Sequence, residues 1–482
     1  MGREDGEKAE PVTPTGRFFL QPKGQNIIHC VVGGKNPIDI EATKAEIENT
    51  LLKPPRFCSL LIRDKHGREL WQKTEVEIDN HIVYPDLSDL VAEEDDEEEV
   101  IINRYLADLA VSSPLDETKP LWEIHVLQAH RCCVLRVHHA LGDGISLMSL
   151  FLACCKRSGR PDLVPSLPQP KRRNLSPTTS VKEKLRRLVL MVWFTVVYCV
   201  QFVLYSLWTE DEETPISGGE GVELWPRMAA TAHFSLDDMK LVKNAVRGTV
   251  NDVLFGVIAS GLARYLEMRS PNKPSKGLRI TGLEMVNRRF PPGLQDPSLM
   301  LEPGSKVRWG NQLGGIILPL VLQRKDPSDP LEYVKRAKAL LDLKKLSMEA
   351  YFSYKMGSFI MSIFGPEVTT WILYRVIAHT TFTISNIVGP QEEIVFAGNP
   401  IRFLRASSTS IPHALTMHMV SYMGKAEMQI LVAKDIILDP RCLAKCFEDA
   451  LLEMKDVVSL PHATDQSPRR FGFPHVSTKT FS

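Results

Sequence analysis

The seven residues 138–144 constrain the fold more than any other segment, because they predict a strand, a tight turn and a helix in direct succession. They read His-His-Ala-Leu-Gly-Asp-Gly. The residues before them, 133–137, are mostly apolar and β-prone, as a buried strand requires. The residues after them, 145–152, are dense in apolar side chains and favour a packed helix. We therefore expect a strand to carry His139 to a turn at its end.

The turn carries groups suited to proton transfer. A neutral imidazole accepts a proton from a hydroxyl group near neutral pH. We choose His139 as the base, because the His-x-x-x-Asp spacing runs from it to Asp143, which can brace the turn. His138 should point to the opposite face of the strand, and Gly142 and Gly144 would let backbone approach where a side chain would clash. The pattern indicates acyl transfer to an alcohol; the alternative is a hydrogen-bonded structural pair of histidines.

Composition narrows the class of protein. The chain has 482 residues, 44% of them hydrophobic, which is enough for a large core divided over two or three domains. Lys plus Arg and Asp plus Glu number 58 each, and this balance does not suggest a nucleic-acid partner. Nine cysteines without a Cys-x-x-Cys pattern favour reduced thiols and give no support to a metal site. The polar N-terminus shows no secretory signal.

The pass along the chain predicts an α/β protein, because strands and helices interleave in both halves. A change of composition after Lys156 marks a linker that contains the uncharged segment 188–208. The predicted organisation is a disordered N-terminus 1–16, a first half 17–159, a linker 160–224, a second half 225–460 and a flexible tail 461–482.

Three further segments accompany the His-His motif in a fixed order: Pro120-Leu121-Trp122, Asn251-Asp252 and Ser385-Asn386-Ile387-Val388-Gly389-Pro390. With them the chain resembles the plant-type bifunctional wax ester synthases/diacylglycerol O-acyltransferases, from about residue 13 to residue 460. His-His-x-x-x-Asp-Gly alone is shared by condensation domains and other coenzyme-A-dependent acyltransferases, and the later segments narrow the choice. The Asp-Phe-Gly-Trp-Gly motif of plant BAHD acyltransferases does not occur.

The resemblance implies a chloramphenicol-acetyltransferase-like fold: two similar α/β halves with an active-site tunnel between them. Acyl-coenzyme A, as co-substrate, would enter from one face, and a long-chain alcohol or diacylglycerol from the other; no cofactor is expected. His139 matches the family's catalytic base and Asp143 its structural partner. In such folds this Asp often acts through an Arg, which the sequence does not identify.

The predicted mechanism is direct transfer. His139 removes the proton of the alcohol as its oxygen attacks the thioester carbonyl, and the imidazolium then assists departure of coenzyme A. Asn251 is the candidate donor to the oxyanion. Its alternative is that Asn251 and Asp252 only cap a helix and brace the interface between the halves. An acyl-enzyme through Ser146 or a cysteine is possible in principle but unnecessary.

The remaining candidates have two interpretations each. Trp122, with Pro120 and Leu121, is expected to pack in the core or shape the tunnel rather than touch substrate. The segment with Ser385, Asn386 and Gly389 either frames the acceptor channel or only ends a strand. Arg288 and Arg289 are candidates for the coenzyme A phosphates, the alternative being an exposed loop pair. Four other histidines are expected to be structural: His125, His379, His413 and His418.

The segment 188–208 raises a question of topology. As a helix it would measure roughly 30 Å, the thickness of a bilayer's hydrocarbon core. If it crossed once, His139 and Asn251 would lie on opposite sides and could not share a tunnel. We therefore expect a re-entrant hairpin, an in-plane anchor or a buried helix. The resemblance and this segment imply that the protein lies at the endoplasmic reticulum membrane, with both halves facing the cytosol.

Two other functions are alternatives to the predicted one. The first is an acyltransferase of the same fold with another acceptor, and the second is an inactive lipid-binding scaffold.

Overall fold

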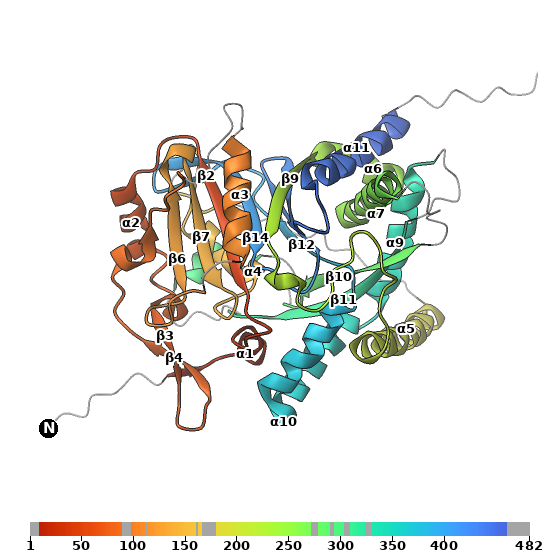
Figure 1. Cartoon of the computed structure of the whole chain (residues 1–482), viewed down its shortest axis with the longest axis horizontal. Coiled ribbons are helices and arrows are strands. Elements are labelled where there is room, and N and C mark those ends of the chain that lie inside the picture. Colours follow the sequence, from red (N-terminus) through yellow and green to blue (C-terminus); the bar gives the residue numbers. More distant parts are fainter. Residues whose placement is uncertain are drawn as a thin grey trace, which may run out of the picture.

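The protein folds around two large β-sheets and one small sheet, each flanked by helices (Figure 1). The computed structural model describes residues 9–88, 98–111, 114–160, 162–165, 180–270, 278–289, 294–302, 309–322 and 329–459. The predicted tail 461–482, residues 166–179 of the linker and most of the acidic run 93–99 lie outside them. Helices and strands alternate through both halves, which confirms the predicted α/β class.

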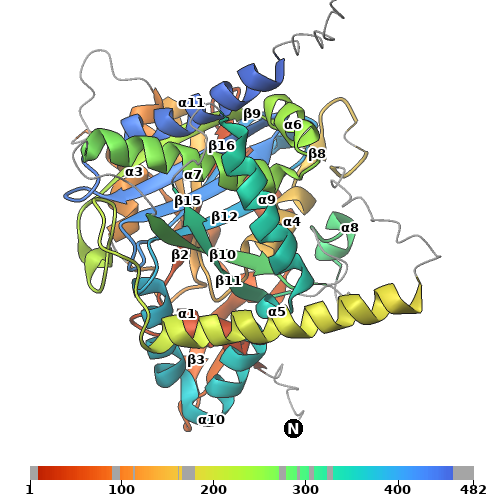
Figure 2. The ribbon, with the colours of Figure 1, turned by 90° about the vertical axis from the view of Figure 1, so that its right-hand side faces the viewer.

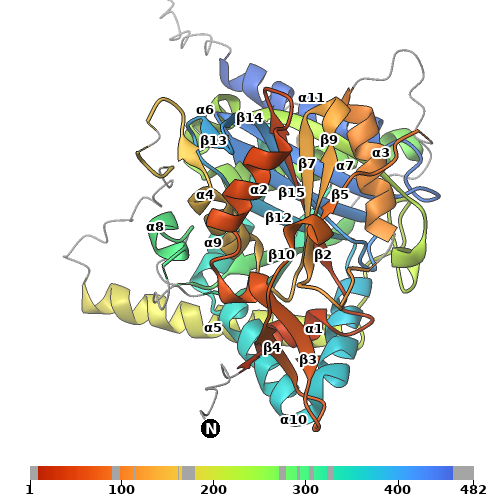
Figure 3. The same ribbon diagram turned by 90° about the vertical axis from the view of Figure 1, so that its left-hand side faces the viewer.

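The first sheet holds the His-His motif at one end of a central strand. Its strand order is β5 (Ile82–Val83), β6 (Trp122–Leu127), β7 (Cys132–His138), β2 (Ile27–Gly34), β14 (Asn399–Ser408), β13 (Ile394–Phe396) and β8 (Lys156–Arg157). Helices α2 (Ile40–Asn49) and α4 (Gly144–Ala153) cover one face, as Figure 3 shows for α2. Helix α3 (Glu98–Val111) packs on the other, against Val31 and Val134. Alternation along the strands supplies apolar side chains to both faces.

The second sheet forms the larger core. Its strand order is β11 (Leu313–Val321), β10 (Arg279–Asn287), β12 (Phe382–Val388), β15 (Leu415–Tyr422), β16 (Lys425–Ala433) and β9 (Arg227–Ser235). Its main helical cover consists of α6 (Leu236–Ala245), α7 (Val250–Arg269), α9 (Leu331–Leu346) and α11 (Pro440–Ser459). The short helix α8 (Pro297–Met300) lies against α4 of the first half. Helix α7 is apolar nearly all round because it is buried between α9 and α11.

Two strands of the predicted second half, 225–460, lie in the first sheet. Strand β14 pairs antiparallel with β2, and β13 joins it to β8. Without β14, strand β2 would expose a row of unpaired backbone groups at a sheet edge. The predicted boundary at residue 225 therefore divides the chain into two stretches but does not separate the strands of the two sheets.

Regular secondary structure begins closer to the N-terminus than predicted. Residues 1–16 were expected to be disordered, but β1 (Glu10–Pro11) pairs with β4 (Glu69–Lys73), which also pairs with β3 (Ser59–Arg63). Helix α1 (Pro14–Phe19) follows and is capped by Thr13. The expectation was wrong for residues 10–16 because apolar Val12 is buried in the first-half core and anchors the segment.

The apolar segment is one straight helix, α5 (Val181–Leu207), which lies beside α10 (Glu349–Ala378) (Figure 2). The hairpin interpretation is excluded, because no turn interrupts α5. Within the described residues, α5 is the one helix long and apolar enough to cross a membrane. Helix α10 bends at Gly365, whose φ is 79°, immediately before Pro366.

Candidate active site

The His-His motif forms the predicted strand, turn and helix. Strand β7 ends at His138, and α4 begins at Gly144. Asp143 caps the helix, since its Oδ1 accepts from the backbone N–H of Ser146 at 2.9 Å. The buried His138 ring accepts from the N–H of Ala140 at 3.1 Å, and burial lowers its pKa to about 3. These contacts agree with the structural part predicted for His138.

His139 lies between the two halves, and Asn311 of the second half holds it. The amide Nδ2 of Asn311 donates to the carbonyl oxygen of His139 at 2.7 Å. This orients the amide so that its Oδ1 faces the Nδ1 of the imidazole, 3.0 Å away. Because an amide oxygen only accepts, Nδ1 carries the proton and Nε2 keeps its lone pair. The ring of Phe19 stacks on the imidazole at 3.9 Å between centroids.

The environment of His139 keeps the imidazole neutral. Burial lowers its pKa below the ordinary 6.5, and nearby Asp143 and Asn311 only partly oppose this effect. No partner occupies Nε2 among the residues that the structure describes, and the residue is only partly buried. A neutral imidazole with a free Nε2 can take a proton from a hydroxyl group near pH 7.

The partner of Asp143 is Arg289, 146 residues away in the chain. Arg289 Nη1 lies 2.7 Å from Asp143 Oδ2, which also accepts from the N–H of Gln312 at 2.9 Å. The same guanidinium donates to Ser146 Oγ and to the carbonyl of Gly310. Asp143 and Arg289 are 0% and 4% exposed. Asp143 thus joins the motif to the second half, and its hydrogen bonds among the described residues do not include one to the imidazole of His139.

Neither interpretation holds for Arg289, and for Arg288 only the exposed-loop interpretation fails, because this residue is half-buried. Arg289 is neither an exposed loop residue nor available to a coenzyme A phosphate, because it is buried on Asp143. The guanidinium of Arg288 lies over the rings of Tyr351 and Tyr354 on α10, at 4.3 and 4.8 Å. Ser146 is fully buried and bonded to Arg289, which leaves its hydroxyl unsuited to an acyl-enzyme.

Asp252 of the Asn251-Asp252 pair caps α7 together with Thr249, and Asn251 connects to the segment with Ser385 and Asn386. Thr249 and Asp252 form a reciprocal capping box at the start of α7. Asn251 Oδ1 accepts from Asn386 Nδ2 at 2.8 Å, so the structure brings these two predicted segments together. Asn251 has no hydrogen bond to His139 among the described contacts. This contact supports the bracing interpretation, and Asn251 as an oxyanion donor stays a prediction.

The other motif residues pack. Trp122 is fully buried and its Nε1 donates to the carbonyl of Phe57 at 2.9 Å, while Leu121 is also buried and follows Pro120. A Cβ on Gly389 would lie 2.4 Å from the carbonyl oxygen of Ser421, so glycine permits β12 to end close to β15. Ser385 lies opposite His418 in the register of β12 and β15.

Of the four histidines expected to be structural, three are held by hydrogen bonds. His125 bonds to Tyr105 and Glu123, His379 to the carbonyl of Tyr205, and His413 to Thr380 and Thr383. His418 differs, because its Nδ1 is buried without a partner among the described residues.

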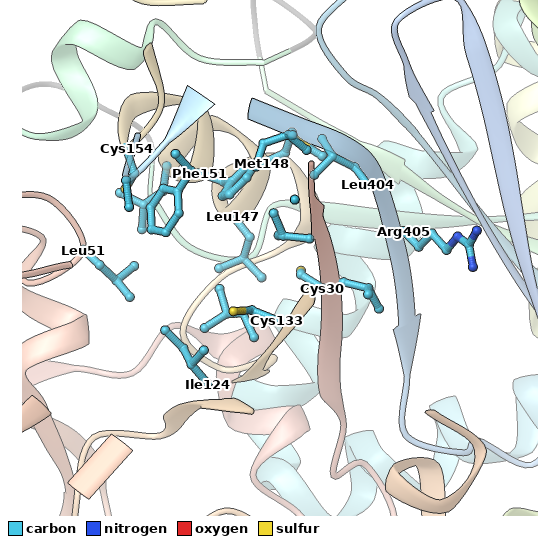
Figure 4. Close-up of a pocket in the computed structure, with 18 of the residues that line it drawn as sticks. Cys30, Leu51, Ile124, Cys133, Leu147, Met148, Phe151, Cys154, Leu404 and Arg405 are labelled. Carbon is cyan, nitrogen blue, oxygen red and sulfur yellow. The ribbon is translucent and has the colours of Figure 1, made fainter. Parts of the chain in front are cut away.

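Two apolar cavities flank the motif. The first cavity, about 1310 Å³ with its open mouth included, lies between the first sheet and helices α2 and α4 and reaches Gly144. Leu147 of α4 also lines it (Figure 4). The second cavity, about 730 Å³ on the same measure, lies beside α10 and reaches Phe19, whose ring stacks on His139. A Cβ on Gly144 would approach Ile387 Cδ1 to 2.7 Å, whereas one on Gly142 would meet Ser146 Cβ at 3.3 Å. The close approach predicted at Gly144 is thus present.

Sequence reasoning missed Asn311 and Phe19, and it named Arg289 only for another role, the binding of coenzyme A phosphates. The sequence did contain a signal for Asn311, because the segment Trp309-Gly310-Asn311-Gln312 is a polar and aromatic cluster directly before strand β11. Trp309 Nε1 also donates to the carbonyl of Leu141 within the motif, at 2.8 Å. Among the described residues, no cluster of His, Cys, Asp and Glu could hold a metal ion.

Comparisons with known proteins match almost the whole chain. Residues 27–254 match the family model described as "Wax ester synthase/diacylglycerol acyltransferase catalytic domain", and residues 309–455 match "WS/DGAT C-terminal domain". Two relatives in Arabidopsis thaliana are named wax ester synthase/diacylglycerol acyltransferase 5 and 6. They are 37% and 34% identical, and the alignments cover 95% and 94% of this chain and 95% of each relative.

Solved structures support the fold. A wax ester synthase/diacylglycerol acyltransferase from Marinobacter aquaeolei VT8 superposes with a TM-score of 0.56 at 15% identity, covering 93% of this chain and 100% of that one. The first condensation domain of the calcium-dependent antibiotic synthetase gives 0.56 at 13% identity, covering 95% and 98%. These likenesses confirm the predicted chloramphenicol-acetyltransferase-like architecture.

Proposed function

This chain belongs to the wax ester synthase/diacylglycerol acyltransferase family, and we propose that it moves a fatty acyl group from acyl-coenzyme A to a long-chain alcohol and to diacylglycerol, with His139 as general base. The family matches confirm the resemblance that the motifs predicted. The observation that carries the assignment of the base is the imidazole held by Asn311 with Nε2 free, between two apolar cavities.

In the proposed reaction, Nε2 of His139 takes the proton of the alcohol while its oxygen attacks the thioester carbonyl. The tetrahedral intermediate then collapses, the carbon–sulfur bond breaks, and the proton passes from the imidazolium to the departing thiolate of coenzyme A. General-base assistance contributes roughly 10²–10⁴-fold, so positioning and oxyanion stabilisation supply the rest.

Several polar atoms on strands β2, β12, β14 and β15 are buried without hydrogen-bond partners in the described part of the chain. Within the described part of the chain, both ring nitrogens of His29, the hydroxyl of Ser407, Nδ1 of His418 and Oδ1 of Asn386 are buried without partners. His29 and Ser407 face each other across β2 and β14. Leaving such groups unpaired costs about 1–3 kcal/mol each.

Product analysis tests the proposed function. The purified protein is given palmitoyl-coenzyme A with hexadecanol or with dioleoylglycerol, and the lipids are separated. We expect a wax ester from the first mixture and triacylglycerol from the second. Absence of both products, with thiol release at the rate of a protein-free blank, would refute the proposed activity.

Changing Asn311 tests how the base is oriented. Asn311→Ala should lower kcat roughly 10–100-fold, because the imidazole loses the acceptor that holds the proton on Nδ1. Asn311→Asp should restore part of the rate but move the acidic limb of the pH–rate profile to higher pH. The new carboxylate raises the pKa of His139, so the base stays protonated over a wider acidic range. Steady-state rates from pH 5 to pH 9 measure both effects. An unshifted profile in Asn311→Asp would contradict the assigned orientation.

We also propose that α5 and α10 rest in the plane of a membrane, at the endoplasmic reticulum with both halves on the cytosolic side. Both helices expose large apolar side chains: Leu188, Val189, Val192, Trp193, Val196 and Val200 on α5, and Phe359, Ile363, Phe364 and Trp371 on α10. Lys182, Lys184, Arg186 and Arg187 at the start of α5 would meet anionic headgroups. Alcohols and diacylglycerol of long chain length dissolve in the same lipid.

The inner face of α5 is fixed to the protein, which argues against a single crossing. Lys344 Nζ lies 3.7 Å from the ring centre of Tyr198, and Thr195 Oγ1 accepts from the N–H of Met348 at 3.0 Å. Near the end of α5, the hydroxyl of Tyr205 hydrogen-bonds with Thr281. A transmembrane orientation would break these contacts, whereas an in-plane helix keeps them.

Charges on the outer face of α5 should weaken membrane binding. Trp193→Glu combined with Val196→Glu removes two apolar side chains worth about 1.5–3 kcal/mol each in lipid, so vesicle affinity should fall at least about tenfold. Vesicle flotation with phosphatidylcholine and phosphatidylserine measures it. The matched control is Leu241→Glu with Leu452→Glu, two exposed leucines on α6 and α11. Equal loss in both pairs would contradict the in-plane arrangement, and so would opposite protease exposure of tags at residues 175 and 215 in microsomes.

A further inference from the structure

The second cavity lies between the base and the helices that face lipid in the proposed membrane arrangement. Helix α10 packs against α1 and α5, and all three helices line the cavity (Figure 2). On α10, Ser353, Gly357 and Met361 are four residues apart, so they share the helix face that lines it. The exposed Phe359 and Ile363 lie on the outer side of the same helix. The thickness of one helix therefore separates the cavity from the surface proposed to meet the bilayer.

Residues of α1 line the second cavity from its outer end to its inner end. Pro14 is exposed, and Thr15 and Phe18 are half-buried. Phe19 is buried, and its ring stacks on the imidazole of His139 at 3.9 Å between centroids. This gradient of exposure places the mouth of the cavity at the start of α1 and its closed end at the base.

The wall that α10 contributes is open and presents little polar surface. A Cβ on Gly357 would meet no atom within 4 Å, so free space begins at the backbone of the helix. The hydroxyl groups of Ser353 and Ser358 donate to the carbonyls of Gly315 and Tyr354, at 3.0 and 2.9 Å. Since these hydroxyl groups already have acceptors within the protein, the space next to α10 suits an apolar group.

The charges around the two cavities favour an uncharged lipid in the second one. Among the described residues that line the second cavity, none carries a charge, whereas Asp39, Arg131 and Arg405 line the first. Acyl-coenzyme A carries several phosphate charges, which are costly to remove from water. A fatty alcohol or diacylglycerol has one free hydroxyl group and dissolves in the bilayer. An uncharged wall that leads from the lipid-facing helices to the base therefore fits the acceptor.

We propose that the acceptor lipid reaches His139 directly from the bilayer, by passing between α1 and α10 into the second cavity. Its hydroxyl group comes to lie at the Phe19 end, beside the base, and the lipid does not cross water on the way. This inference rests on the proposed function and on the in-plane position of α5 and α10. It requires that acceptors delivered by the membrane and acceptors delivered by water respond differently to a change in the cavity.

A phenyl group at Gly357 closes this passage next to α10. In Gly357→Phe, the rate with hexadecanol or dioleoylglycerol in vesicles should fall at least roughly tenfold, because the ring occupies the space that the acceptor crosses. The rate with butanol added from water and the KM for palmitoyl-coenzyme A should stay at their wild-type values, because neither ligand uses the lipid-facing mouth. Thr15→Trp narrows the mouth from α1 and should give the same pattern, which provides a second test if Gly357→Phe does not fold.

Ser362→Phe is the matched control for the added ring. Ser362 is exposed on α10, so the same phenyl group is placed outside the cavity. Vesicle flotation should show equal membrane binding of wild type, Gly357→Phe and Ser362→Phe, and Ser362→Phe should keep the wild-type rate with every acceptor. This comparison separates a closed passage from a weakened membrane contact.

Three results would overturn the proposal. Equal losses with vesicle-borne acceptors and with butanol would contradict a route that belongs to membrane-borne acceptors. A higher KM for palmitoyl-coenzyme A with unchanged use of the acceptor would assign the second cavity to the acyl chain instead. Wild-type rates with all acceptors, in folded Gly357→Phe and Thr15→Trp, would show that the acceptor takes another path.

Photolabelling provides a readout that needs no turnover. A long-chain alcohol with a diazirine at the end of its chain is placed in vesicles of phosphatidylcholine and phosphatidylserine, irradiated with the protein, and the modified residues are mapped. We expect labels at residues 14–19 and on the cavity face of 353–361, which excess hexadecanol removes. The labels should be lost in Gly357→Phe and kept in Ser362→Phe. Labels confined to Phe359 and Ile363 would show only adsorption on the outer face and would contradict the passage. If wild type forms no ester, the proposed function fails, and this labelling still decides for or against the route.

Discussion

Replacing His139 by alanine should lower kcat/KM for acyl transfer by roughly 10²–10⁴-fold, the contribution of a positioned general base. The neutral ring held by Asn311 is the group that takes the alcohol proton in the proposed mechanism. Initial rates with palmitoyl-coenzyme A and hexadecanol measure the loss. Unfolding of His139→Ala by urea should stay close to wild type, because the ring is only partly buried.

The pH dependence of wild type gives a second test of the same base. Burial lowers the pKa of His139 below 6.5, so the base stays deprotonated as the pH falls through 6.5. Activity should therefore be retained there and be lost only at lower pH, as the ring protonates. His66→Ala, an exposed loop histidine, is the control and should leave both rate and profile unchanged. If His139→Ala transferred acyl groups at the wild-type rate, His139 would be excluded as the base.

Arg289→Ala should destabilise the protein by about 3–5 kcal/mol, the cost of leaving a buried charge without its partner. Asp143 is fully buried and would lose the guanidinium that lies 2.7 Å from Oδ2. The carbonyl of Gly310 and the hydroxyl of Ser146 would lose a donor at the same time. Urea unfolding followed by tryptophan fluorescence measures the effect. Activity should fall as well, since Asn311 follows this carbonyl and holds His139.

The neighbouring arginine supplies a matched control for this prediction. Arg288 carries the same charge but lies over the rings of Tyr351 and Tyr354, a contact worth about 0.5–1 kcal/mol. Arg288→Ala should therefore shift the unfolding free energy much less than Arg289→Ala. Arg289→Lys should recover only part of the loss, because an ammonium group cannot reproduce the fork of hydrogen bonds. If Arg289→Ala, Arg289→Lys and Arg288→Ala all changed the free energy of unfolding by equal, small amounts, the buried ion pair of Asp143 and Arg289 would not hold the two halves together.

Local structure was predictable where the determining residues are neighbours in the chain. The succession β7, turn and α4 follows from apolar residues that flank two glycines and an aspartate. The capping box between Thr249 and Asp252 needs only a three-residue spacing. Strand and helix periods depend on the nearest few residues, so such patterns predict elements without knowledge of the fold.

The arrangement of the site was not predictable in this way. Arg289 reaches Asp143 across 146 residues, and Asn311 reaches His139 across 172. Sequence spacing alone does not distinguish Arg289 and Asn311 from the other arginines and asparagines of the chain. Likewise, β14 joins β2 from more than 360 residues away, and α5 lies along α10 instead of folding into a hairpin.

The sequence alone therefore determined the class of elements, the family and the imidazole that is the candidate base. The tertiary structure decided which ring nitrogen of that imidazole carries the proton, which arginine pairs with Asp143, and where the two apolar cavities lie. Local hydrogen bonds and side-chain periods are set by covalent spacing. Hydrogen-bond partners across the interface come together only when the two halves pack. Packing removes distant polar groups from water, and each buried group then needs a partner within the protein.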